Sequence, residues 1–273
     1  MRKPGDLIMN ANFRAGVVSA TLRQYAFKNF IKHVIKTDLS CIEWGSDIHV
    51  PYNDLNKAAD VAAEMARNNL VAASYGSYYK LGRLPFQQDD GEKEKLFNMI
   101  LNTAKILGAP MIRVWGGVRG SDQLDAEARQ EIIEDALAIA AIAQQENIDI
   151  SLEYHKDTIT DTAESALDFI NKARDSGGSN IYLYWQANSL LSFTENKNEL
   201  IQVLPFVSNV HVQAREGNKR LTLAEHKHHW QEYIDIIKSD GRKHDFLIEF
   251  TPNDSPECFV EDAKVLVDLL GVI

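Results

Sequence analysis

The sequence predicts a single (β/α)8 TIM barrel that includes residues 1–273. Short runs rich in β-branched and aromatic residues alternate with longer stretches in which apolar residues recur three or four positions apart. Eight such runs, each followed by a helical stretch, match the repeat of this barrel. No segment rich in Ser, Gly or Pro interrupts the alternation, so we expect no domain boundary. An open doubly wound sheet is the alternative, but no Gly-x-Gly-x-x-Gly motif follows a run to support its dinucleotide-binding form.

The eight strands are predicted from apolar runs that end at polar or Gly-containing segments. They cover residues 15–20, 40–45, 70–76, 111–117, 148–155, 181–186, 208–213 and 245–250. The stretches between them have a helical period, which is clear in residues 54–70 and is sustained over a longer span in residues 125–147. The last helix, within residues 255–271, opens with a Ser-x-x-Cys cap and closes at Gly271.

The composition limits the classes of function. A formal net charge of −10 disfavours binding to duplex nucleic acid, which needs a basic surface. No apolar run reaches about 18 residues and the N-terminus has no long apolar region, so we expect neither a membrane span nor a signal peptide. The two cysteines, Cys41 and Cys258, are far apart and make no disulfide framework, which favours the cytoplasm. The sequence leaves a homo-oligomer open.

The run at residues 148–155 ends in chemically active side chains. Because strand side chains alternate, Ile150 and Leu152 fall on one face, whereas Glu153 and His155 fall on the other. In a barrel the apolar face packs against helices and the polar face points inward. The last residues of each strand line the mouth at the C-terminal end, where the chemistry of such barrels takes place. We therefore expect Glu153 and His155 at this mouth.

Strands five to eight each bring one polar side chain to the same mouth. By the same alternation, Gln186, His211 and Glu249 join Glu153 there, each about one strand–helix unit after the one before. Carboxylates, a carboxamide oxygen and an imidazole form a mixed oxygen and nitrogen set. This set suits one divalent ion, Mn²⁺, Mg²⁺, Co²⁺ or Zn²⁺, and lacks the thiolates of a structural zinc site.

Other residues near strand ends have a structural and a functional interpretation. His155 either binds substrate or supports its neighbours, and His49 of the second loop is a further candidate for substrate binding. Trp115 either stacks on a substrate or forms an apolar wall. Glu43 and Arg113 both point inward, and we favour a buried ion pair, because an unpaired charge there would cost several kcal/mol.

Three more candidates for substrate binding follow strands three and seven. Tyr75 belongs to the aromatic segment 74–79, which could cover the site. Gln213 shares the inward face of His211. Arg215 opens a basic loop that either binds a phosphate or is simply charged.

The chain resembles the xylose isomerase-like TIM barrel superfamily, in its sugar phosphate isomerase/epimerase branch. The segments that carry the resemblance are IEWGSDIHVP, GAPMIRVWGG, SLEYHKDTITDT, YWQ, VHV and LIEFTPNDSPECFVEDA. They span most of the chain and are specific for the superfamily but not for a substrate. Members bind one divalent metal ion through Glu, Asp, His and Glu at the ends of strands five to eight. These positions fall on Glu153, Gln186, His211 and Glu249, and Gln186 departs from the commoner Asp.

The resemblance also implies the chemistry. The metal polarises a carbonyl of a small carbohydrate, and Glu153 and Glu249 act as the acid and base for proton transfer beside it, in an isomerase or epimerase. A lyase or dehydratase acting on a keto-sugar or inosose through the same site is the alternative. An apurinic-type endonuclease would need more His and Asp ligands at the mouth. A non-catalytic sugar-binding barrel fits poorly with two intact glutamates.

Overall fold

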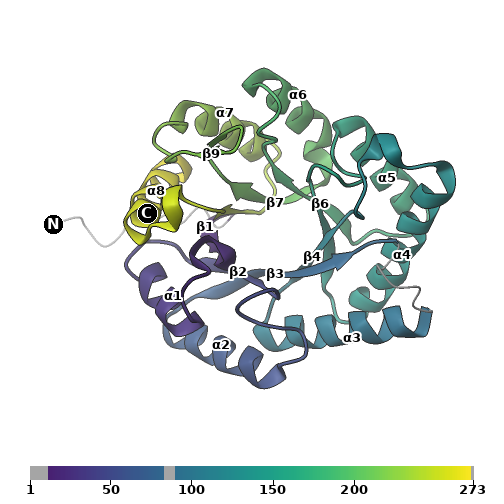
Figure 1. Ribbon diagram of the computed structural model, residues 1–273, viewed down its shortest axis with the longest axis horizontal. Coiled ribbons are helices and arrows are strands. Elements are labelled where there is room, and N and C mark those ends of the chain that lie inside the picture. The colour runs from purple at the N-terminus through teal and green to yellow at the C-terminus, as the bar shows by residue number, and fades with distance from the viewer. Residues whose placement is uncertain (1–11, 83–89, 272–273) are drawn as a thin grey trace.

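The computed structural model describes residues 12–82 and 90–271, and these form a closed barrel of parallel strands ringed by helices (Figure 1). Around the barrel the strands follow the order β1, β2, β3, β4, β5, β6, β7 and β10, and β10 pairs with β1 to close it. The predicted (β/α)8 TIM barrel is therefore confirmed.

The barrel strands lie close to the eight predicted runs. They are β1 (Phe13–Val18), β2 (Cys41–Gly45), β3 (Val71–Lys80), β4 (Met111–Trp115), β5 (Asp149–Glu153), β6 (Ile181–Gln186), β7 (Val207–Val212) and β10 (His244–Ile248). Several predicted runs extend past the point where the chain leaves the sheet. As a result Glu249 lies directly after its strand rather than within it. β3 is longer than predicted, and its register against β4 shifts between Gly76 and Lys80.

The helices cover the outside of the barrel, and α2, α4, α5, α6 and α8 start at side-chain caps. They are α1 (Phe27–Val34), α2 (Leu55–Arg67), α3 (Asp90–Leu107), α4 (Ala126–Gln144), α5 (Ala163–Asp175), α6 (Phe193–Val203), α7 (Lys227–Lys238) and α8 (Pro256–Leu270). Asp54 and Asp125 each accept a backbone N–H three residues on, at 2.9 Å, which satisfies a donor that the first turn leaves free. Gly271 ends α8 in a left-handed conformation, as its position in the sequence predicts.

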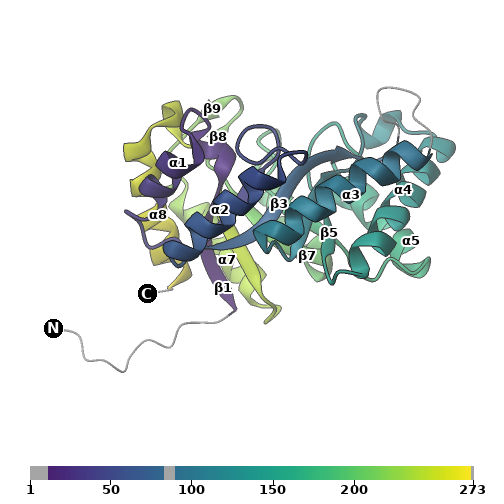
Figure 2. The same cartoon turned by 90° about the horizontal axis from the view of Figure 1, so that it is seen from below.

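A short hairpin was not predicted from the sequence. β8 (Arg215–Glu216) and β9 (Lys219–Arg220) pair antiparallel across a turn at Gly217, whose φ is +55°. The hairpin stands at one end of the barrel, opposite the end at which β1 begins (Figure 2). It follows β7 directly, so it rises beside the mouth at the C-terminal ends of the strands.

The apolar core lies mainly between the strands and the helices, and the inside of the barrel is largely polar. One large cluster of buried apolar side chains joins strands to helices, and a small cluster that includes Cys41, Met111 and Leu247 fills part of the interior. The rest of the interior holds buried polar groups, among them Glu43 and Arg113. No helix among residues 12–82 and 90–271 is long and apolar enough to span a membrane.

Candidate active site

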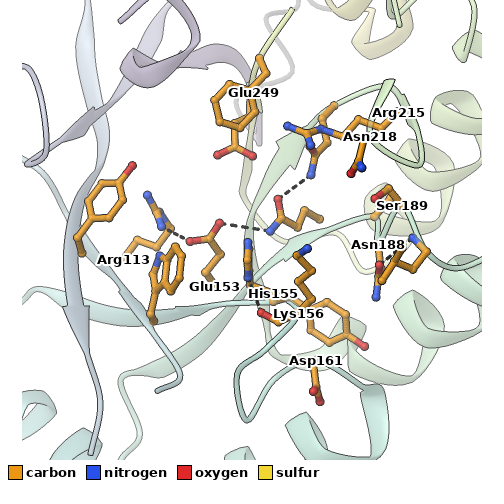
Figure 3. Close-up of a pocket in the computed structure, with 18 residues that line it drawn as sticks. Arg113, Glu153, His155, Lys156, Asp161, Asn188, Ser189, Arg215, Asn218 and Glu249 are labelled. Atoms are coloured by element: carbon orange, nitrogen blue, oxygen red, sulfur yellow. Dashed lines mark hydrogen bonds and ion pairs between the residues drawn. The ribbon is translucent and has the colours of Figure 1, made fainter. Parts of the chain in front are cut away.

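A cavity of about 200 Å³ opens at the C-terminal ends of the strands (Figure 3). Polar residues from five of the barrel's strand ends line it, as the alternation of the sequence predicts. Those that matter most below are Trp115, Glu153, Gln186, Gln213, Arg215 and Glu249. His211 lies beneath them, fully buried within β7.

Glu153, His211 and Glu249 converge at the floor of this cavity. One potential ligand atom from each lies within 4.8 Å of the others. His211 Nδ1 is 3.7 Å from Glu153 Oε1 and 3.6 Å from Glu249 Oε2, and it is buried without a hydrogen bond. An imidazole nitrogen without a partner between two carboxylates is the arrangement that a divalent cation would complete.

The other ring nitrogen of His211 is held by Glu43. Nε2 lies 3.4 Å from the Glu43 carboxylate, and the Tyr184 ring packs against the imidazole with centroids 4.6 Å apart. Because a carboxylate can only accept, this contact places a proton on Nε2, and in the neutral imidazole Nδ1 then carries the lone pair that a metal ion needs. A carboxylate behind a histidine is the usual device that orients a metal-binding imidazole.

Arg113 joins two of the buried glutamates. Its Nε donates to Glu43 Oε1 at 2.8 Å, and its Nη1 pairs with Glu153 Oε2. Ser74 also donates to Glu43, at 2.7 Å. Burial works to raise the pKa of Glu43, but Arg113 and His211 outweigh it and hold the pKa below its usual range. The expected buried ion pair of Glu43 and Arg113 is confirmed. The second ion pair, between Arg113 and Glu153, was not predicted from the sequence.

Gln186 turns its amide donor, not its oxygen, toward Glu153. Gln186 Nε2 donates to Glu153 Oε1 at 3.2 Å, whereas Gln186 Oε1 accepts from Gln213 Nε2 at 2.8 Å. The sequence predicted that the Gln186 oxygen would join the metal ligands. In the structure the amide donor faces Glu153 and helps to hold it in place, because a carboxylate requires a donor. The oxygen accepts from Gln213 and keeps a second lone pair, so its role as a metal ligand stays a prediction.

The floor of the cavity carries excess negative charge. Three buried carboxylates face the single Arg113 guanidinium. Burial works to lower the pKa of His211, but Glu249 and Glu43 outweigh it and raise the pKa, and even a protonated His211 leaves one negative charge without a partner. Burial raises the pKa of Glu249; His211 works against this rise, and Glu153 adds to it. Buried charges are stable only when they are paired, so a divalent cation matches both the donor set and the charge.

Aromatic side chains form one wall of the cavity. The rings of Trp115 and His155 stack with centroids 4.8 Å apart, and Lys80 Nζ lies 5.3 Å from the centre of the Trp115 ring. Tyr78 lines the cavity beside them, with its ring 6.3 Å from that of Trp115. Trp115 and His155 were both predicted to be near the mouth, and Tyr78 was not singled out.

Two of the predicted substrate-binding residues lie elsewhere. Tyr75 is fully buried, and its hydroxyl donates to the Val50 carbonyl at 2.6 Å. His49 Nε2 is 3.0 Å from the Tyr25 carbonyl, and its ring packs against Trp44. Neither lines the cavity of Glu153. Tyr75 falls on the helix-facing side of β3. Beyond Gly76 the register of β3 against β4 shifts, and Tyr78, with φ of +57°, is the tyrosine whose side chain reaches the cavity.

The opposite wall comes from loops that sequence alternation does not reach. Asn188, Ser189 and Asn218 line the cavity next to Arg215 (Figure 3). Asn188 and Ser189 follow the end of β6, and Asn218 lies in the β8–β9 turn. Their position after a strand end and their polar character were the available signals. Gln213 and Arg215, both predicted near the mouth, also line the cavity.

Comparison with known proteins identifies relatives at the level of family and fold. The family model described as "Xylose isomerase-like TIM barrel" matches residues 31–269. No curated protein matches the chain.

Among solved structures, the probable 3-DHS dehydratase AsbF from Bacillus anthracis has a TM-score of 0.73 at 16% identity, over 93% of this chain and 98% of that one. D-psicose 3-epimerase from Clostridium cellulolyticum H10, solved with D-tagatose, has a TM-score of 0.71 at 14% identity, over 94% and 98%. A xylose isomerase-like TIM barrel protein from Mycobacterium smegmatis in complex with magnesium has a TM-score of 0.68 at 14% identity, over 96% and 98%. At these identities the likeness shows the fold.

Proposed function

The chain belongs to the xylose isomerase-like TIM barrel family, and from this premise we propose that it is a divalent-metal-dependent isomerase or epimerase of a sugar or sugar phosphate. The observation that carries the proposal is the convergence of Glu153, His211 and Glu249 on one point of an open cavity. The reaction is proton transfer at a carbon next to a carbonyl. D-psicose 3-epimerase, which has the same fold, is a sugar epimerase by name and supports this reading.

The three converging residues would hold the metal ion. His211 would bind through Nδ1, and each glutamate through one carboxylate oxygen. Mn²⁺, Mg²⁺, Co²⁺ and Zn²⁺ all accept such ligands, and a fold relative was solved with magnesium. A bound divalent ion would polarise a substrate carbonyl and make the hydrogen on the neighbouring carbon more acidic. Gln186 supports Glu153 in this arrangement through its amide donor.

Glu249 is the group best placed to remove a proton. Its carboxylate has one ion-pair contact among the described side chains, with His211 Nδ1 at 3.6 Å, and receives no hydrogen bond from them. Burial raises its pKa in the metal-free site, which favours a role as a base. Glu153 is fixed by Arg113 and Gln186 and faces the same point, so it can return a proton from its own side. The stacked Trp115 and His155 offer a flat surface to the substrate and exclude water.

Dehydration is a second candidate function, favoured by the unequal surroundings of the two glutamates. Glu153 receives an ion pair and an amide donor, whereas Glu249 receives neither. If Glu249 alone transfers protons, it would remove the proton next to the carbonyl and deliver it to the departing β-hydroxyl, so that a C=C bond forms and water leaves, and the enzyme would be a dehydratase. The probable dehydratase AsbF shares the fold.

Hydrogen exchange with solvent tests the proposal. The protein is incubated in D₂O with Mn²⁺ and a panel of ketoses, aldoses, their phosphates, inososes and 3-keto-sugars, and each compound is followed by NMR. We expect deuterium at one carbon next to a carbonyl, with an isomer or epimer as product. Loss of water from the exchanged compound identifies the dehydratase instead. Absence of exchange in the whole panel, with metal bound to the protein, would contradict both functions.

A further inference from the structure

Two buried hydrogen-bond donors at the cavity have no acceptor. Trp115 Nε1 and Arg215 Nε are both shielded from solvent, and neither forms a hydrogen bond with the rest of the described chain. Both residues line the cavity that contains Glu153 and Glu249. Buried donors are nearly always paired in folded proteins, so donors left free at a cavity indicate what the cavity receives. The two nitrogens themselves are covered, so a ligand in the cavity meets the half-buried remainder of each side chain, and the cationic guanidinium favours acceptor oxygens there.

Arg215 also lacks a counter-charge. Among residues 12–82 and 90–271, no carboxylate forms an ion pair with its guanidinium, and Glu249 is the acid that most affects it. The proposed function commits Glu249 to the metal ion. Burial lowers the pKa of Arg215, and Arg220 adds to this effect. The guanidinium is therefore a partly desolvated cation without a committed partner.

Arg220, in the same hairpin, is a comparison for Arg215 because its charge is neutralised by an ion pair. Arg220 forms an ion pair with Asp254 and does not line the cavity. Both guanidinium groups pack on the Phe250 ring, with Cζ at 4.4 Å from its centre for Arg220 and 5.1 Å for Arg215. Two arginines thus share one aromatic support, and only the one that faces the cavity is left without a partner.

Asn188 adds a donor on the same side of the cavity. Its Oδ1 accepts the backbone N–H of Leu190 at 3.0 Å, which leaves its amide NH₂ free for a ligand. Asn188, Ser189, Asn218 and Arg215 gather on one side in Figure 3, whereas Asp161 lies at the other end of the cavity. The side chains near Arg215 therefore favour acceptor oxygens.

We propose that the substrate carries an anionic oxygen group, a carboxylate or a phosphate, and that Arg215 binds it together with the Asn188 amide. The inference rests on the proposed function, because it describes the end of the substrate that lies away from Glu153, His211 and Glu249. A neutral hydroxyl would satisfy the Arg215 hydrogen bond but would not offset its charge. The planar guanidinium matches both carboxylate and phosphate, and such charge-assisted bonds are about twice as strong as neutral ones.

Matched neutral and anionic probes test this inference. Binding of fructose and fructose 6-phosphate, and of glucose and glucuronate, is measured by calorimetry on Mn²⁺-loaded protein at one ionic strength. We expect at least one anionic member to bind about 10- to 100-fold more tightly than its neutral partner. The phosphate and carboxylate pairs show which of the two groups is recognised. Arg215→Gln should abolish the preference, and the matched control Arg220→Gln should retain it.

A direct readout complements the affinities. Inorganic phosphate and acetate are titrated while the side-chain Nε–H signal that Arg215→Gln removes is followed by NMR, and we expect one of these anions to shift that signal. The inference is overturned if neither anion shifts it and the anionic sugars bind no more tightly than the neutral ones, or if the preference survives in Arg215→Gln. A Mn²⁺ titration of the same samples separates the two proposals: a protein that binds no metal contradicts the proposed function, whereas one that binds metal without anion preference contradicts this inference alone.

Discussion

The two sides of the barrel mouth hold their glutamates in different ways. On the side of β4 to β6, Glu153 receives an ion pair from Arg113 and an amide hydrogen bond from Gln186. On the side of β7 and β10, Glu249 stands just beyond its strand, and among the described side chains its one ion-pair contact is His211 Nδ1, at 3.6 Å. The Glu153 carboxylate is thus held in position by two donors, whereas burial raises the pKa of Glu249. The same residue type is thus held in two different ways by its neighbours, and under the proposed function Glu249 is the better suited of the two to remove the first proton.

Removal of the less supported carboxylate should have the largest effect on activity. Glu249→Gln keeps the shape and one ligand oxygen but removes the base, and we expect solvent-proton exchange on the true substrate to fall about 10²- to 10⁴-fold. Mn²⁺ content is measured on the same sample, because lost metal would give a similar result. If the variant keeps both its metal and full exchange, Glu249 is not the base and Glu153, with His155 as a possible proton partner, takes its place.

Removal of the cation on the opposite side should affect stability. Arg113→Met leaves Glu43 and Glu153 buried without their partner, and we expect a loss of about 3–5 kcal/mol in the free energy of unfolding. Urea denaturation measures it. Arg67→Met is the control, because Arg67 pairs with Glu64 on the exposed surface of α2 and its loss should cost about 1 kcal/mol or less. Equal losses in the two variants would refute a special role for Arg113.

Replacement of Gln186, whose amide donates to Glu153, by an acid should strengthen metal binding. Gln186→Asp exchanges a donor for a carboxylate and increases the negative charge at the floor of the cavity, so we expect affinity for Mn²⁺ to rise about tenfold. Gln213→Asn shortens the side chain that donates to Gln186, which weakens this hydrogen bond without adding charge, and should produce no such rise. Isothermal titration of Mn²⁺ into both variants decides the point. Unchanged affinity in Gln186→Asp would show that this position does not influence the metal.

Asp262, a buried acid that does not line the cavity, provides a reference for a carboxylate without an ion pair. Burial raises the pKa of Asp262 on α8 to about 6, although the Leu223 N–H that it accepts at 2.6 Å lowers it. Its pKa in the unfolded chain is about 3.9, so between about pH 4 and pH 6 the folded state holds a proton that the unfolded state has lost. The free energy of unfolding should fall as pH rises through this window and then level off. Asp262→Asn should remove that slope and add about 1–3 kcal/mol above pH 6. Unfolding curves from pH 4 to pH 8 that have the same slope in both proteins would contradict it.

The sequence predicts the barrel and much of the site because both follow from local alternation. Glu153 and His211 fall on inward faces of short, regular strands, and their convergence follows from barrel geometry. Alternation fails where a strand is irregular. In β3 the register shift after Gly76 brings Tyr78 to the cavity and leaves Tyr75 in the core.

Side-chain orientation is less accessible from sequence than position. The amide of Gln186 has two possible orientations, and its partners, Glu153 and Gln213, are 33 and 27 residues away. The choice depends on their joint arrangement in space, which no local pattern records. The lack of an ion pair at Arg215 is equally hidden in the sequence. It becomes evident only when the structure shows that the nearby Arg220 pairs with Asp254.

The central claim is that Glu153, His211 and Glu249 bind one divalent metal ion, and a crystal structure of the protein grown with Mn²⁺ tests it most directly. Anomalous scattering locates the ion independently of any assumption about its ligands. The account predicts a single peak between the three side chains, with His211 Nδ1 and one oxygen of each glutamate roughly 2.0–2.3 Å from it and the Gln186 oxygen still bonded to Gln213. A peak elsewhere, or a fully formed cavity without a peak at saturating Mn²⁺, would contradict the claim.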